Sequence, residues 1–143
     1  MAVEGSDNFR EEYSPTLGVV FSQRILDRAA VYVEPLWVGN ANKPGLLHPQ
    51  RLPRGDASDT FLVGLGARLR VLETVYVVAE YVPRVHGFDQ GADHISVGFE
   101  KRVGGHIFQL NISNSLGVTP VQLAQGGDLH DWFIGFNIAR KLY

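Results

Sequence analysis

From residue 15 onward, hydrophobic and polar side chains alternate with a period of two, which is typical of β-strands whose two faces meet different surroundings. The alternation is clearest over residues 60–72, where Phe61 and Leu65 fall on one face and Gly66 and Arg68 on the other. It recurs over residues 16–25, 75–82, 95–100, 108–113 and 132–139, and residues 30–38 are β-rich but less regular. No segment shows a convincing helical period. The sequence therefore predicts an all-β fold of about seven strands.

Short and long connections alternate between these strands. The short ones lie near residues 26–28, 72–74 and 103–105, and the last contains Gly104-Gly105, which supplies the positive φ angles of a tight hairpin turn. The long ones cover residues 40–59, 86–93 and 116–131. This alternation predicts an antiparallel up-and-down meander of about 7–8 strands, with every tight turn at one end and every long loop at the other. Such asymmetry is typical of transmembrane β-barrels, so we expect the strands to form a barrel or part of one.

The polar face of the strands suits a crowded barrel interior better than a surface in bulk water. It carries glycines, arginines and glutamates, and its central positions hold no lysine. Glycine weakens an exposed strand but fits where side chains converge, and arginine tolerates burial when it is paired with a carboxylate. We expect the arginines of this face to pair with its glutamates across the interior. The predicted lumen-lining residues are Arg24, Glu34, Arg68, Arg70, Glu80, Arg84, Glu100, Arg102, Gln109, Asn111 and Asn137.

The apolar face is then expected to meet lipid, because an Arg or Lys placed at the bilayer midplane costs about 2–4 kcal/mol. Trp37, Tyr81 and Trp132 lie at or near strand ends on this face, where a membrane interface favours aromatic rings, although core packing explains any one of them equally well. The predicted lipid-facing residues are Leu17, Val19, Phe21, Phe61, Val63, Leu65, Val97, Phe99, Phe108, Leu110, Ile112, Ile134 and Phe136.

Composition narrows the functions that remain. The 143 residues fit one domain, with residues 1–13 as a polar flexible leader and residues 14–143 as the barrel domain. The net charge of -2 argues against nucleic-acid binding, and the absence of cysteine excludes thiolate chemistry. His86 and His94 with Asp93, and His130 with its neighbouring aspartates, are explained by polar loops, so we expect no metal. With no nucleophile elbow or nucleotide fingerprint, we expect neither a cofactor nor an enzyme.

Several segments resemble one known family. They are residues 104–115 (GGHIFQLNISNS), 95–100 (ISVGFE), 134–140 (IGFNIAR) and 75–81. The last of these segments ends in Ala79-Glu80-Tyr81. They are similar to motifs of the DUF5777 family of bacterial outer-membrane-type β-barrels, and the resemblance runs over most of residues 15–143. It implies a bacterial outer-membrane location and no known catalysis. The chain resembles the C-terminal half of the family's members, which implies part of a larger barrel whose signal peptide is not in this sequence.

The resulting hypothesis is a non-enzymatic outer-membrane β-barrel protein, structural or with a porin-like passage for small polar solutes. Its partners would be membrane lipid and no nucleic acid. Two alternatives stay open. One is a soluble lipocalin-like barrel that binds an apolar ligand. The other is a barrel subunit completed by a partner chain or by self-association, because seven strands leave open edges that lipid does not tolerate.

Overall fold

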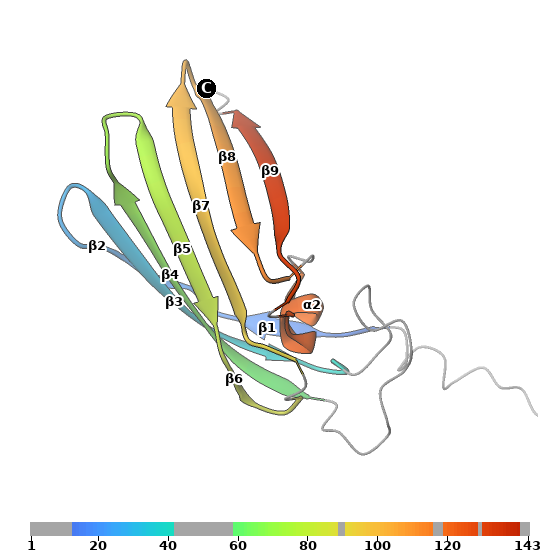
Figure 1. Cartoon of the computed structure of the whole chain (residues 1–143). Helices are drawn as coiled ribbons and strands as arrows, with labels where there is room; N and C mark the ends of the chain where they lie inside the picture. Colours follow the sequence, from blue (N-terminus) through green and yellow to red (C-terminus); the bar gives the residue numbers. More distant parts are fainter. Residues whose placement is uncertain (1–12, 42–58, 89–90, 116–118, 129, 141–143) are drawn as a thin grey trace, which may run out of the picture.

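The computed structural model describes residues 13–41, 59–88, 91–115, 119–128 and 130–140. These residues form a curled, nine-stranded antiparallel sheet and one short helix (Figure 1). The elements are β1 (Thr16–Gly18), β2 (Phe21–Arg24), β3 (Ala29–Val38), β4 (Thr60–Arg70), β5 (Val75–Val82), β6 (Arg84–His86), β7 (His94–Val103), β8 (His106–Ser113), α2 (Pro120–Gln125) and β9 (Phe133–Arg140). Strand order follows the chain, β1-β3-β4-β5-β7-β8-β9, with β2 also paired to β3 and β6 to β4. The predicted all-β antiparallel meander is confirmed.

Two prolines explain why nine strands occupy seven positions across the sheet. β1 and β2 run along the same side of β3 and are separated opposite Pro35, whose carbonyl accepts the N–H of Val19 at 3.2 Å. β5 and β6 run along β4 and are separated at Pro83, whose carbonyl accepts the N–H of Val63 at 3.0 Å. Proline has no N–H to return a second bond, so the ladder is interrupted at both places while the chain keeps its direction.

The tight turns lie together at one end of the sheet, as Figure 1 shows for the β2–β3, β4–β5 and β7–β8 connections. In the β7–β8 turn, Gly104 has φ 53° and Gly105 has φ 81°, so the predicted glycine hairpin is confirmed. In the β2–β3 turn, Leu26 adopts φ 81° despite its side chain. We call this the tight-turn end and the opposite one the long-loop end.

The helix α2 contradicts the expectation that no segment is helical. Its six residues make less than two turns, too short for a helical period to be visible in the sequence. The local signal is a capping box: the Thr119 side chain accepts the N–H of Gln122, and the Gln122 side chain accepts the Thr119 N–H at 3.2 Å. Pro120 in the first turn is a further helix-start signal.

α2 lies on one face of the sheet at the long-loop end and forms the small hydrophobic core there. Ala124 is fully buried, and the Gln125 side chain donates a hydrogen bond to the Ala41 carbonyl at 3.1 Å. The core consists of Leu36, Val38, Ala41, Leu62, Val82 and Ala124, with Val121 and Leu123 packed against it. The helix α2 thus covers the sheet at the long-loop end.

The predicted division of the chain at residues 13 and 14 stays a prediction, because residues 1–12 lie outside the described residues. The same holds for residues 42–58, most of the first predicted long loop. Within the described part of the chain, no helix has the length and apolar character needed to cross a bilayer.

Candidate functional site

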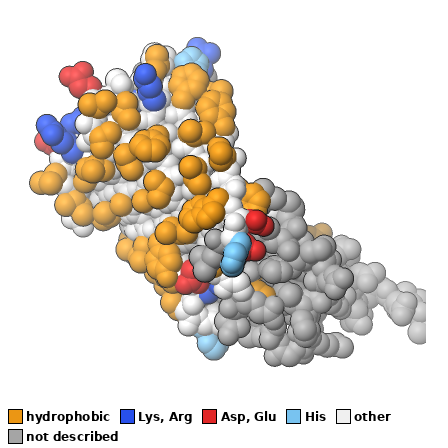
Figure 2. Space-filling model, in the orientation of Figure 1, with side chains coloured by type: hydrophobic (Ala, Val, Ile, Leu, Met, Phe, Trp, Pro, Cys, Tyr) orange, Lys and Arg blue, Asp and Glu red, His pale blue; other side chains and the backbone are white. Residues whose placement is uncertain are grey.

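The two faces of the sheet carry different chemistry. We call the face that bears α2 the inner face and the opposite one the outer face. Along β4 the exposed fraction alternates accordingly, with Phe61 45% exposed and Leu62 1% exposed. Strand register then places the predicted lumen-lining residues on the inner face and the predicted lipid-facing residues on the outer face, except Val19, which lies between β1 and β2 and has no register partner. Figure 2 shows hydrophobic side chains spread across one broad surface of the sheet, with charged groups near its upper rim.

Inner-face side chains contact one another across an intervening strand. Tyr32 on β3 donates a hydrogen bond from its hydroxyl to Glu80 on β5, and its ring lies over Gly66 on β4. A Cβ atom on Gly66 would lie 1.8 Å from Cε1 of Tyr32, so only glycine leaves room for this contact. The curl of the sheet toward this face brings such side chains within reach of one another.

A second cluster lies nearer the tight-turn end. Arg68 on β4 forms a two-pronged ion pair with Glu100 on β7, at 2.5 Å from Nη2 to Oε1 and 3.1 Å from Nε to Oε2. Arg102 reaches the same carboxylate at 3.1 Å. The guanidinium of Arg68 stacks on the Tyr76 ring, 3.7 Å from its centroid, and that of Arg102 lies 4.9 Å away. One glutamate and one aromatic ring therefore hold two arginines against the inner wall.

The expected pairing of arginines with glutamates is only partly correct. Arg68 and Arg102 pair with Glu100, as predicted. Arg84 on β6 instead pairs with Asp93, at 3.3 Å from Nε to Oδ1, because Asp93 lies at the end of the β6–β7 connection, beside it. Arg24 and Arg70 form no ion pair within the described ranges of the chain. The alternation in the sequence predicts on which face of the sheet a charged side chain lies, but it does not predict which residue pairs with it.

The structure adds polar groups that sequence reasoning did not select for the lumen. His94 is 4% exposed, with Nε2 3.8 Å from Oε2 of Glu80. Its Nδ1 and the Oδ1 of Asn111 are buried, and neither has a hydrogen-bond partner among the described residues. The period-two positions of Tyr32 and Tyr76 predict their place on the inner face, whereas the polar residues around His94 favour a loop. Among the residues that the structure describes, no group of three or more His, Asp or Glu could hold a metal ion.

Comparison with protein families gives one match. The model of a family described as a membrane bound beta barrel domain, DUF5777, covers residues 2–142. The chain belongs to the DUF5777 family. Comparison with curated proteins and comparison with solved structures each gave no match.

Membership confirms the resemblance carried by the motif segments and sets the soluble lipocalin-like alternative aside, because the DUF5777 domain is membrane-bound. The outer face agrees with this. Phe99 is 58% exposed, Leu110 48% and Phe136 61%. Side chains packed in a closed hydrophobic core would be far less exposed. A contiguous apolar surface of this kind indicates contact with lipid or protein. The family supports a structural or transport role over catalysis.

The two edges of this DUF5777 domain are open in the described part of the chain. β9 pairs with β8 alone, and β1 and β2 pair with β3 alone. In hydrocarbon an unpaired strand edge exposes N–H and C=O groups that nothing satisfies. The described sheet is therefore an incomplete barrel wall.

Proposed function

We propose that this chain forms the wall of a bacterial outer-membrane β-barrel and that its inner face borders a passage for small polar solutes. The observation that supports this most directly is the division of the sheet into an apolar outer face and a polar inner face. Lipid favours the first and water the second.

Glycines on the inner face limit how far the side chains of the wall project into the interior. Gly98 and Gly135 flank Asn111 in register on the neighbouring strands, and neither adds a side chain to the wall. The Asn111 side chain lies against Gly135, where a Cβ atom would be 2.6 Å from its Oδ1, and Asn137 on β9 is exposed on the same face. The passage would then be lined by groups able to exchange hydrogen bonds with a hydrated solute.

A liposome-swelling assay tests the passage. Proteoliposomes containing the full chain should take up a small neutral sugar faster than protein-free liposomes. Asn111→Trp should slow uptake, because the indole would occupy the space beside Gly98 and Gly135. Leu110→Trp is the matched control, since it places the same ring on the outer face of the same strand and should leave uptake unchanged. No uptake by the wild-type chain, or equal uptake by both variants, would contradict the proposal.

The outer-membrane location needs its own test. Membranes from an expressing bacterium, carrying the chain behind an export signal, should contain it in the dense outer-membrane fraction of a sucrose gradient. The folded chain should also migrate faster on a gel before heating than after it. Recovery in the inner-membrane or soluble fraction would refute the location while leaving the membrane-bound family unaffected.

We propose further that the open edges at β9 and at β1 and β2 pair with strands of a second copy or of a partner chain. Native mass measurement in detergent micelles distinguishes the possibilities. A mass of two copies supports self-association, and an added polypeptide co-purified from the native membrane supports a partner chain. A stable folded species of one chain alone would refute both.

A further inference from the structure

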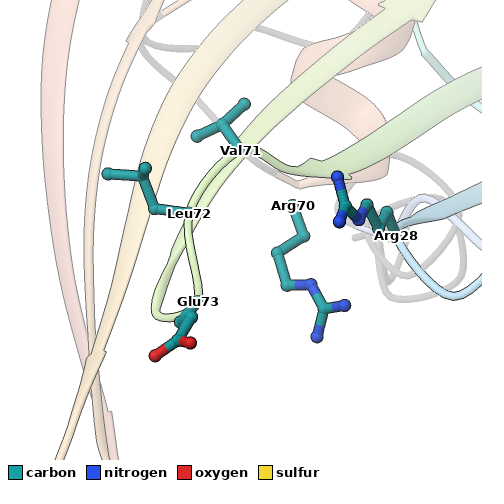
Figure 3. Close-up of a pocket in the computed structure, with 5 residues that line it drawn as sticks. All are labelled: Arg28, Arg70, Val71, Leu72 and Glu73. Carbon is teal, nitrogen blue, oxygen red and sulfur yellow. The ribbon is translucent and has the colours of Figure 1, made fainter.

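A concentration of positive charge lies on the inner face at the tight-turn end. Arg70 ends β4, and its N–H donates to the carbonyl of Arg28 at 2.7 Å, so the two residues stand directly opposite each other. Both line a pocket of about 620 Å³, together with Val71, Leu72 and Glu73. In Figure 3, Arg70 and Glu73 extend to one side of the β4–β5 turn while Val71 and Leu72 extend to the other.

The lining of this pocket contains two arginines and one glutamate. Neither Arg28 nor Arg70 forms an ion pair or a side-chain hydrogen bond with a described residue, and Glu73 lies beyond ion-pair distance of both. Their neighbours Arg68 and Arg102 already share Glu100. Like charges placed directly opposite each other on paired strands destabilise the sheet. The opposition of Arg28 and Arg70 is therefore a local cost that a bound counter-charge would remove.

We infer that this pocket binds a small soluble anion that carries a phosphate or carboxylate group. The guanidinium fork matches the oxygens of both groups and forms charge-assisted hydrogen bonds with them. Two arginines against the single Glu73 leave the lining with an excess of positive charge. The pocket volume accommodates a phosphate group with part of an attached organic moiety.

The position of the pocket favours a soluble anion over a lipid headgroup. Arg70 shares the inner face with Arg68, since they are two residues apart on β4, whereas bilayer lipid meets the outer face. This step rests on the proposed function, because it takes the inner face as the aqueous side. In a passage, such a site would raise the local concentration of anions at the tight-turn entrance.

Calorimetric titration of the full chain, folded in uncharged detergent micelles at low ionic strength, tests the site with inorganic phosphate as the probe. The wild type should bind phosphate saturably. Arg28→Gln and Arg70→Gln should each weaken binding at least about tenfold, the effect of losing a charge-assisted hydrogen bond. Arg140→Gln is the matched control. It removes an equal charge at the same end, but on the outer face opposite His106, and should change affinity by less than about twofold.

The outcomes separate cleanly. Absence of saturable phosphate binding, or an equal loss in Arg140→Gln, overturns the inference. Arginine-dependent binding of dihexanoyl phosphatidylglycerol without phosphate binding overturns it in favour of a lipid headgroup. Each glutamine variant removes one of two like charges that stand opposite each other across paired strands, so thermal unfolding without phosphate should occur no lower than that of the wild type. A chain that binds phosphate but fails the swelling assay keeps the anion site and loses the passage.

Discussion

Gly66 is the position at which a single methyl group should disturb the inner face most clearly. In Gly66→Ala, the new Cβ would lie 1.8 Å from Cε1 and 2.1 Å from Cζ of Tyr32. These distances are far below van der Waals contact, so the ring has to leave its place over β4. Its hydrogen bond to Glu80 is then lost, because the hydroxyl reaches that carboxylate only across Gly66.

The expected cost combines opposing effects. Overpacking costs about 1–3 kcal/mol, and loss of a hydrogen bond to a charged group costs about 1.5–3 kcal/mol. Replacing glycine by alanine also stabilises the folded state by about 0.4–1 kcal/mol, because it lowers the conformational entropy of the unfolded chain. We therefore expect the free energy of unfolding to fall by about 2–5 kcal/mol.

Gly64→Ala is the matched control, because Gly64 lies two residues away on the same strand and face. A Cβ there would lie 3.3 Å from Cβ of Glu34, which requires a shift of only a few tenths of an ångström. Its cost should stay below about 1 kcal/mol. In a Tyr32→Ala background the clash partner is gone, so Gly66→Ala should cost little there, and the double-mutant cycle should show a coupling of at least about 1 kcal/mol.

The assay is equilibrium unfolding by guanidinium of the chain folded in detergent micelles, followed by far-ultraviolet circular dichroism. The midpoint and slope give the free energy for each variant. A Gly66→Ala cost no larger than that of Gly64→Ala would refute the reasoning. So would an unchanged cost in the Tyr32→Ala background, because the ring would then not be the obstacle.

Three further predictions test other parts of the molecule by equilibrium unfolding, the first two in detergent micelles and the last in liposomes. Glu100→Gln should lower the free energy of unfolding by about 1–3 kcal/mol, which lies between the values for surface and buried ion pairs. The reason is the partial burial of the pair, since the Glu100 side chain is 12% exposed and that of Arg68 is 32% exposed. No change would show that the cluster does not stabilise the fold. Ala124→Leu should cost about 1–3 kcal/mol by overpacking the core beneath α2, and a neutral result would mean that α2 is not held there. Leu110→Arg should cost about 2–4 kcal/mol in liposomes, whereas Asn111→Arg on the inner face should cost clearly less. Equal costs at these adjacent positions would contradict the assignment of the two faces.

The alternation of side chains was sufficient to predict strands and faces because its period equals that of the strand itself. Phe61 and Leu62 differ in exposure as their alternate positions require. The Gly104-Gly105 turn was equally predictable, because its positive φ angles favour glycine at both positions. These features depend on residues close together in the chain.

Features that depend on distant residues could not be predicted in the same way. The contact of Tyr32 with Glu80 requires the register of β3, β4 and β5 together, and a shift of one residue in any strand would remove it. Asp93 pairs with Arg84 because a loop returns it there, and no period marks a loop residue. The sequence does not predict the pocket at Arg28 for a related reason. Residues 26–28 indicate a short turn, and only the strand register sets Arg28 opposite Arg70.

The inner face differs from one end to the other, and this has a consequence for the proposed passage. At the long-loop end α2 covers an apolar patch that includes Leu36 and Leu62, whereas at the tight-turn end Arg28 and Arg70 line an open pocket. In such a passage, a solute entering from the tight-turn end would meet arginines first, and one entering from the other end would meet a packed helix first. The arginines attract anions over a range of about 10 Å at ordinary salt, whereas the packed helix only excludes solutes that are too large. The tight-turn end should therefore select solutes by charge and the long-loop end by size. Anion preference should therefore fall in Arg28→Gln and Arg70→Gln, while a change of α2 should alter the size limit for all solutes alike.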